Sequence, residues 1–188
     1  KGVDCMYGFD IDGTVTDTSA LVSCIQKEYP AFKSEHLTSY CIGESLFYNG
    51  HIKSIDNYCN KTFFTKHSRE MILTSPLRKG FVDFYNELMK QGRRVVFITA
   101  RHPLNERLTI EHFAKNGLPT GNIYHVGSTN KVELIKELGV TKFFEDNLDT
   151  AKRISELEGV ESYLINTIYN QCSESKKIKR FDNWSDLL

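Results

Sequence analysis

The sequence predicts an α/β protein built on a parallel sheet. From about residue 80 onward, short apolar runs of strand type alternate with amphipathic runs of helical type. This alternation is typical of βαβ units, whose strands run parallel. Another apolar run near the start of the chain ends at two carboxylates, Asp10 and Asp12. Open α/β sheets place their ligands at the carboxyl ends of the strands, so we expect the functional site there.

The first half of the chain predicts one strand followed by helices. Residues 6–11 are the strand, and Gly13 and Thr14 end it. Apolar residues then recur at helical spacing until Pro30, and again over residues 51–72, while residues 31–50 show no regular pattern. Because residues 17–76 contain no β pattern, we expect a small α-helical cap inserted after strand 1. The predicted core domain is then formed by residues 1–16 and 77–188, and the cap domain by residues 17–76.

The second half of the chain predicts four more strands, each preceded by a helix that a glycine or proline delimits. We expect these strands over residues 95–99, 123–126, 142–144 and 162–165. The tail is polar except for Phe181 and residues 184–188, which we expect to dock as a last short helix.

Composition excludes several classes of function. The 188 residues contain 24 Lys and Arg against 24 Asp and Glu, so no overall positive charge attracts nucleic acid or an anionic membrane. No apolar run reaches membrane-spanning length, and the start of the chain lacks the pattern of a signal peptide. The five cysteines are scattered and form no C-x-x-C pair, which favours a reducing, cytoplasmic location.

Asp10 and Asp12 are candidates for binding a metal. Carboxylates on alternate residues of an extended chain point to the same side, and they repel each other unless a cation or a shared proton lies between them. Hard oxygen ligands on a short element suit Mg²⁺. The alternative is a pair of solvated acids in a tight turn.

Four segments, each at a strand end or a helix start, occur in order along most of the chain: Phe9–Thr14, Phe97–Arg101, Lys131 and Phe143–Asp149. Together they resemble the four motifs of the haloacid dehalogenase superfamily of phosphotransferases. The helical cap and the segment Ile98–Arg101 look most like the 5′-nucleotidases and 5′(3′)-deoxyribonucleotidases of that superfamily. This resemblance implies a Rossmann-like sheet with strand order 5-4-1-2-3.

The resemblance also implies a set of site residues. Asp10 is the expected nucleophile and Asp12 the general acid and base. Mg²⁺ is expected on Asp10, Asp146 and the backbone carbonyl of Asp12. Thr99 and Lys131 are expected to assist catalysis and, with Ala100 and Arg101, to bind the phosphoryl group.

Several of these residues also fit roles outside a catalytic site. Thr99 is a β-branched residue at a strand end, Arg101 could be a surface charge, and Lys136 is a rival for Lys131. Glu145 replaces an Asp that is frequent in the relatives, and its role stays open. Asp149 and Asp17 fit helix caps better than ligands.

The expected activity is Mg²⁺-dependent hydrolysis of phosphomonoesters through an aspartyl-phosphate. The resemblance associates an acid at the position of Asp12 with ester hydrolysis or with a mutase. Nucleoside monophosphates are the expected substrates, and sugar phosphates are the alternative. A catalytically idle module on the same fold and a nucleic-acid 3′-phosphatase are further alternatives. The even charge balance argues against a polymeric substrate, and oligomeric state is not predicted.

Aromatic residues in the predicted cap suggest how a flat leaving group is selected. Four of them are candidates for a stacking surface, although aromatic residues in helices usually pack into a core: Phe47, Tyr48, Phe63 and Phe64.

Overall fold

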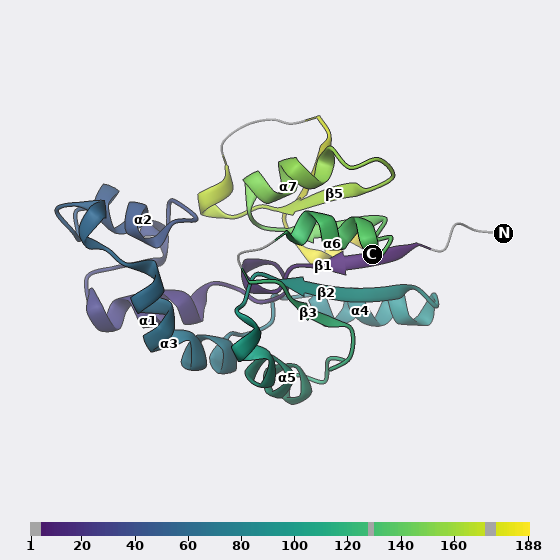
Figure 1. Ribbon diagram of the computed structural model, residues 1–188, viewed down its shortest axis with the longest axis horizontal. Coiled ribbons are helices and arrows are strands. Elements are labelled where there is room, and N and C mark those ends of the chain that lie inside the picture. The colour runs from purple at the N-terminus through teal and green to yellow at the C-terminus, as the bar shows by residue number, and fades with distance from the viewer. Residues whose placement is uncertain (1–4, 128–129, 172–175) are drawn as a thin grey trace.

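The protein is described by a computed structural model covering residues 5–127, 130–171 and 176–188. At its centre lies a six-stranded sheet whose paired strands are all parallel (Figure 1). The strands are β1 (Met6–Phe9), β2 (Arg94–Thr99), β3 (Ile123–His125), β4 (Lys142–Glu145), β5 (Glu161–Ile165) and β6 (Ile178–Phe181).

The strand order is β3-β2-β1-β4-β5-β6. The α/β class is confirmed, but the full strand order differs from the predicted one because the sheet has six strands rather than five. Read from the opposite edge, the sheet follows 5-4-1-2-3 and carries an additional strand, β6, beside β5. The sequence Ile-Lys-Arg-Phe hides this edge strand, because only its two end residues are buried. The predicted last short helix is present as a 3₁₀ turn, Trp184–Leu187.

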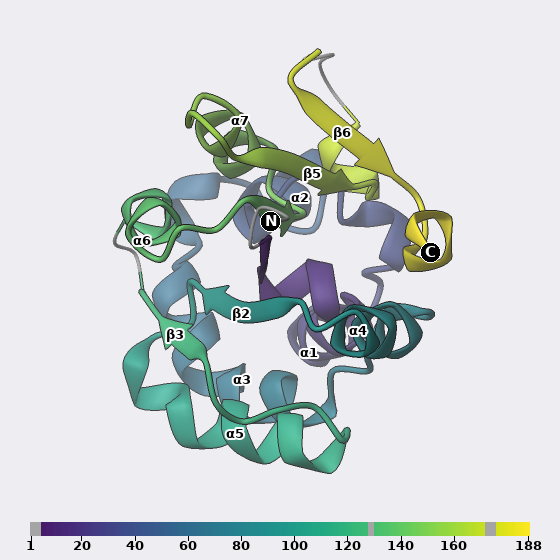
Figure 2. The same ribbon diagram turned by 90° about the vertical axis from the view of Figure 1, so that its right-hand side faces the viewer.

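Alternate residues of the strands face opposite sides of the sheet, and helices cover both (Figure 2). Helices α4 (Phe81–Lys90) and α5 (Glu106–Lys115) contribute to the aromatic core on one side. Helices α6 (Lys131–Glu137) and α7 (Leu148–Ser155) pack on the other.

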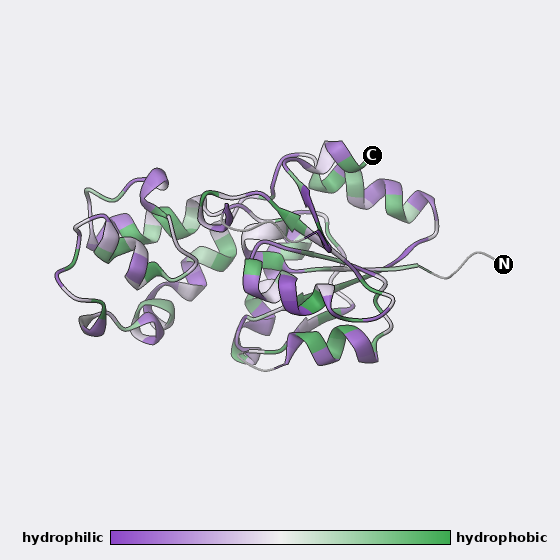
Figure 3. Ribbon diagram, turned by 90° about the horizontal axis from the view of Figure 1, so that it is seen from above, coloured by the Kyte–Doolittle hydropathy of each residue, from purple (hydrophilic) through white to green (hydrophobic). Residues whose placement is uncertain are grey.

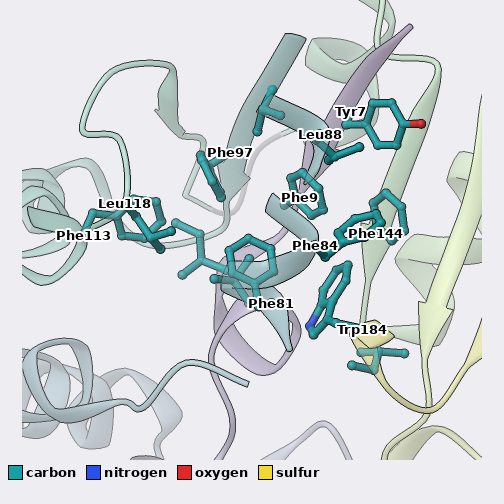
Figure 4. Close-up of a cluster of buried hydrophobic side chains, with 14 of the residues drawn as sticks. Tyr7, Phe9, Phe81, Phe84, Leu88, Phe97, Phe113, Leu118, Phe144 and Trp184 are labelled. Atoms are coloured by element: carbon teal, nitrogen blue, oxygen red, sulfur yellow. The ribbon is translucent and has the colours of Figure 1, made fainter. Parts of the chain in front are cut away.

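Aromatic rings dominate the first of these cores (Figure 4). Phe9 of β1 stacks on Phe144 of β4 at a centroid distance of 4.9 Å, and Trp184 lies 5.7 Å from Phe9. Both strands therefore have a buried ring one or two residues before their acids, and this packing fixes where the strands end.

The helical insertion, residues 17–76, contains α1 (Ser19–Glu28), α2 (Ile42–Tyr48) and α3 (Asn60–Thr74). These helices lie beyond one end of the sheet, away from α4 (Figures 1 and 3). They enclose a hydrophobic cluster of their own, whose fully buried members include Ile25, Phe32 and Leu46. The two connections to the sheet pair with each other, since the Asp17 amide donates to the Pro76 carbonyl at 3.0 Å.

Two expectations for the insertion are wrong in detail. The predicted helix over residues 51–72 begins only at Asn60, because Ser54 accepts a hydrogen bond from the Asp56 amide and starts a separate 3₁₀ turn. The segment 31–50, expected to be irregular, contains α2. Gly43 does not interrupt that helix; it allows Tyr58 to approach, since a Cβ there would lie 3.1 Å from the Tyr58 ring.

None of the helices in the described ranges is both long and apolar enough to cross a membrane. Cys5, Cys24, Cys41 and Cys59 are free thiols, and Cys172 lies outside the described residues.

Candidate active site

The carboxyl ends of β1 and β4 bring three acids together. These strands are neighbours in the sheet, and the Asp10 amide continues their pairing by donating to the Phe144 carbonyl at 2.9 Å. Asp10 follows β1, Glu145 ends β4, and Asp146 comes next. Their carboxylates offer oxygens that all lie within 4.8 Å of one another, and the three residues are only 5, 1 and 2% exposed.

Three buried carboxylates at this spacing fit a divalent cation. Lys131 supplies one positive charge to the group, which leaves an excess of negative charge in a desolvated place. The donors are all hard oxygens, which suit Mg²⁺. The predicted contribution of the Asp12 backbone carbonyl stays a prediction, while Glu145 joins the group of possible ligands.

The pKa values reflect the same excess of charge. Burial and the negative charges of Glu145 and Asp12 raise the pKa of Asp10 to about 7, although Lys131 opposes the shift. Burial and the charges of Glu145 and Asp10 also raise the pKa of Asp146 well above its usual value. A cation among these groups would favour their ionised forms.

Lys131 occupies the predicted position in the site. It opens α6, and its Nζ lies 2.6 Å from Asp10 Oδ1 and 2.9 Å from Glu145 Oε2. The rival Lys136 is exposed on the same helix. The other oxygen of Glu145, Oε1, accepts the backbone amides of Asp146 and Asn147 at 3.2 and 3.1 Å. Glu145 thus connects the lysine to the loop that carries Asp146.

The Asp12 side chain points toward Arg101 and away from the cluster of Asp10, Glu145 and Asp146. Arg101 Nε and Nη2 donate to the two Asp12 carboxylate oxygens at 2.8 and 2.7 Å. The Arg101 side chain is 4% exposed and that of Asp12 is 55% exposed. Partial desolvation of the carboxylate opposes the shift, but the positive charge of Arg101, together with that of Lys131, holds the pKa of Asp12 below its usual value.

The second predicted segment lies next to this pair. Thr99 ends β2 and is buried, and its Oγ1 accepts the Arg101 amide at 3.1 Å. Ala100 is exposed between them. Arg101 is therefore not a free surface charge: Thr109 Oγ1 also accepts a hydrogen bond from its Nη1 at 3.1 Å.

Asp12 lies in a tight turn, Ile11–Val15, that follows Asp10. The conformation of this turn depends on Gly13. Gly13 has φ +81°, and a Cβ there would lie 2.2 Å from Asp146 Oδ2. The next residue, Thr14, places Oγ1 3.4 Å from Asp10 Oδ2 and 3.3 Å from Asp146 Oδ1, so its hydroxyl connects the two acids.

Asp17 and Asp149, which we expected to be helix caps, are not part of the buried carboxylate cluster. Asp17 accepts the Ser19 amide at 2.8 Å at the start of α1. Asp149 is exposed in the first turn of α7, where the Asn147 side chain is the cap.

Sequence reasoning missed two tyrosines at the site. Tyr169 donates a hydrogen bond to Asp146 Oδ2, and its ring lies 6.1 Å from that of Tyr40 in the helical insertion. Desolvation and the charges of Asp146, Asp10, Glu145 and Asp12 raise the pKa of Tyr40, although 58% of the residue is exposed. Both lie in irregular segments, where no periodic pattern marks them.

Four aromatic residues of the insertion were candidates for a stacking surface. One of them, Phe63, is buried in the hydrophobic cluster of the insertion. Phe47, Tyr48 and Phe64 are exposed. Their described ring contacts are with neighbouring aromatics of the insertion.

A second group of possible metal ligands, Cys24, His67 and Glu70, lies between α1 and α3. Lys27 forms an ion pair with Glu70, and His67 contacts Glu28 at 2.9 Å. We assign these contacts to the packing of the two helices.

The chain is similar in sequence to bacterial proteins named as nucleotidases. No family model matches the chain. A protein of Halalkalibacterium halodurans, provisionally named a nucleotidase, is 29% identical over 96% of this chain and 89% of its own length. A nucleotidase of Clostridium acetobutylicum is 28% identical over 95% of this chain and 88% of its own.

Solved structures share the fold over nearly the whole chain. A haloacid dehalogenase hydrolase of family IA from Entamoeba histolytica has a TM-score of 0.64 at 14% identity, covering 98% of this chain and 95% of that one. The protein CbbY of Rhodobacter sphaeroides, solved with phosphate, has a TM-score of 0.65 at 17% identity, covering 98 and 96%.

The chain thus resembles nucleotidases in sequence over nearly its whole length, and it shares its fold with hydrolases of the haloacid dehalogenase superfamily. The predicted α/β fold class is thereby confirmed, and the likeness to proteins named nucleotidases agrees with the predicted family and with an enzyme of the phosphatase class. The predicted site residues lie at the ends of β1, β2 and β4, in the turn after β1 or at the start of α6: Asp10, Asp146, Thr99, Asp12 and Lys131.

Proposed function

We propose that this protein is a Mg²⁺-dependent phosphomonoester hydrolase that acts on nucleoside monophosphates through a phosphorylated Asp10. The observation that carries this proposal is the buried group of Asp10, Glu145 and Asp146 with Lys131 at its side. Mg²⁺ bound there would neutralise the phosphoryl oxygens, which otherwise repel an anionic nucleophile.

The first half of the reaction forms a bond between a carboxylate oxygen of Asp10 and phosphorus, and it breaks the bond to the leaving oxygen. Asp12 gives its proton to that oxygen. Lys131 and the Thr99 hydroxyl stabilise the transferred phosphoryl group. In the second half, water attacks the phosphorus of the aspartyl-phosphate, Asp12 takes the proton, and phosphate and the Asp10 carboxylate are released.

The Asp12–Arg101 pair supports the second half in particular. Arg101 favours ionised Asp12, which is the form that accepts a proton from water. For the first half, Asp12 must be protonated and must turn toward the leaving oxygen. We therefore propose that Arg101 then contacts the phosphoryl group, the role that the sequence motif predicts for it.

We also propose that residues 17–76 are a cap domain over a core formed by residues 1–16 and 77–188. Their separate hydrophobic cluster and the pairing of Asp17 with Pro76 support this division. The preference for nucleotides rests on the nucleotidase relatives and on Tyr40, the exposed cap aromatic that lies close enough to the acids to be affected by their charges. We expect a small-molecule substrate and no nucleic acid or membrane partner.

Removing the metal tests the proposal. EDTA should abolish phosphate release and excess Mg²⁺ should restore it, because the acids repel the substrate without a cation. Ca²⁺ should inhibit, since it prefers longer bonds and more ligands than octahedral Mg²⁺. The measurement is phosphate released from a nucleoside 5′-monophosphate, and full activity in chelator contradicts the metal assignment.

A further inference from the structure

The segment that follows β5 contacts Asp146 through both its side chain and its backbone. It forms a short 3₁₀ turn, Ile168–Asn170. The Tyr169 hydroxyl donates to Asp146 Oδ2, and Asn170 Nδ2 donates to the Asp146 carbonyl at 2.7 Å.

The turn is itself held in place. Asn170 is 1% exposed, and its Nδ2 also donates to the Ile165 carbonyl at 2.8 Å. Its Oδ1 accepts the Thr167 amide at 3.0 Å, and its carbonyl accepts Arg180 Nη2 from β6 at 2.7 Å. The edge strand β6 thus holds the turn that carries Tyr169.

Space around the contact is restricted. A Cβ at Gly13 would lie 2.7 Å from the Tyr169 hydroxyl oxygen as well as 2.2 Å from Asp146 Oδ2. On the other side, Thr14 Oγ1 is 3.3 Å from Asp146 Oδ1. The Asp146 carboxylate therefore has a different partner on each oxygen, and a rotation of the carboxylate breaks the contact with Tyr169.

We propose that Tyr169 is a positioning residue, which fixes the Asp146 carboxylate in the orientation that binds the cation. The inference rests on the proposed function, because it requires a cation at Asp146. Partners that orient metal ligands typically contribute 10- to 100-fold in metal affinity or activity, as a rough guide. Tyr169 is not expected to touch the substrate's phosphoryl group itself.

The test is Tyr169→Phe, with Mn²⁺ as the probe. This change removes the hydroxyl and keeps the ring, including its contact with Tyr40. The matched control is Tyr163→Phe, because the Tyr163 hydroxyl donates to Glu161 at 2.8 Å, away from the acids. Bound Mn²⁺ is measured by electron paramagnetic resonance without substrate, and the melting temperature in EDTA is recorded for each protein.

We expect Tyr169→Phe to raise the Kd for Mn²⁺ by about tenfold or more, with a melting temperature in EDTA close to that of the wild type. Tyr163→Phe should leave the Kd within about twofold. An unchanged Kd in folded Tyr169→Phe overturns the inference and leaves the proposed function intact. If Asp146→Asn does not weaken Mn²⁺ binding, the cation lies elsewhere, and both the metal site and this inference are wrong.

Discussion

At the residue scale, the contacts of Lys131 separate it from the other lysine on its helix. Its ammonium group lies between Asp10 and Glu145 and is shielded from solvent, whereas Lys136 is exposed. A compact positive charge at this position can balance the negative charges of Asp10 and Glu145 and those of the incoming phosphoryl oxygens.

We therefore expect Lys131→Ala to lower kcat/KM for phosphate release by about a hundredfold or more, since it also leaves two buried acids without their cationic partner. Lys136→Ala is the matched control and should stay close to the wild type. Steady-state kinetics on one nucleotide compares them, and a slower Lys136 variant would mean that we have assigned the wrong lysine.

The residue scale also shows what a sequence pattern can locate. Asp10 and Asp12 were predicted because they follow an apolar strand, and open parallel sheets place their ligands at strand ends. Asp146 was predicted because its segment resembles the fourth motif of the haloacid dehalogenase superfamily. The partner of Asp12 was not predicted: nothing in the sequence indicates that Arg101 makes two hydrogen bonds to it. Glu145 was left open because its role depends on contacts with Lys131 and with two backbone amides.

At the scale of elements, the predictions succeeded where the apolar period is regular. Strand β2 and helices α4 and α7 have buried residues at the expected spacing. They failed for α2, which is short, for the start of α3, and for β6, whose middle residues are exposed. Tyr169 was missed for a related reason, since its turn is fixed by hydrogen bonds to β5 and β6 rather than by a hydrophobic pattern.

Among the aromatic residues of the helical insertion, Tyr40 is the candidate for stacking on the base of a nucleotide substrate. Stacking of a base on an aromatic ring is worth roughly 1–3 kcal/mol in nucleic-acid binders, which is about five- to 150-fold in affinity. Tyr40→Ala should therefore lower kcat/KM for a nucleoside 5′-monophosphate about tenfold and leave ribose 5-phosphate, which has no base, nearly unchanged.

Tyr48→Ala is the matched control, because Tyr48 is exposed in α2 and its described ring contact is with Phe47. Tyr40→Phe should retain the preference, since it keeps the ring. If Tyr40→Ala keeps the wild-type ratio between the two substrates, the ring does not select the base. If the wild type itself prefers ribose 5-phosphate, the substrate class is wrong instead.

At the scale of the whole molecule, the buried acids connect stability to pH. Burial and neighbouring negative charges raise the pKa of Asp10 to about 7 in the folded protein, well above its ordinary value of 3.8. The folded state then binds a proton that the unfolded state has already lost. The contribution of Asp10 to the free energy of unfolding therefore decreases as pH rises from about 4 to about 7.

In EDTA, the melting temperature of the wild type should consequently fall relative to that of Asp10→Asn as pH rises through this range. The comparison with Asp10→Asn removes the opposing effect of buried histidines such as His112, whose pKa burial lowers. Mg²⁺ should reduce the fall by stabilising the ionised acids. Parallel curves for the two proteins in EDTA would show that Asp10 does not titrate as the structure indicates.

The central proposal for the whole molecule is that Asp10, next to a bound metal ion, acts as the nucleophile in the hydrolysis of nucleotides. The most direct measurement is phosphate release from a panel of nucleoside monophosphates and sugar phosphates with Mg²⁺, for the wild type and for folded Asp10→Asn. We expect the wild type to prefer nucleoside monophosphates and Asp10→Asn to lose orders of magnitude in rate, because an amide is a poor nucleophile and a poor metal ligand. Near-normal phosphate release by Asp10→Asn would contradict the account.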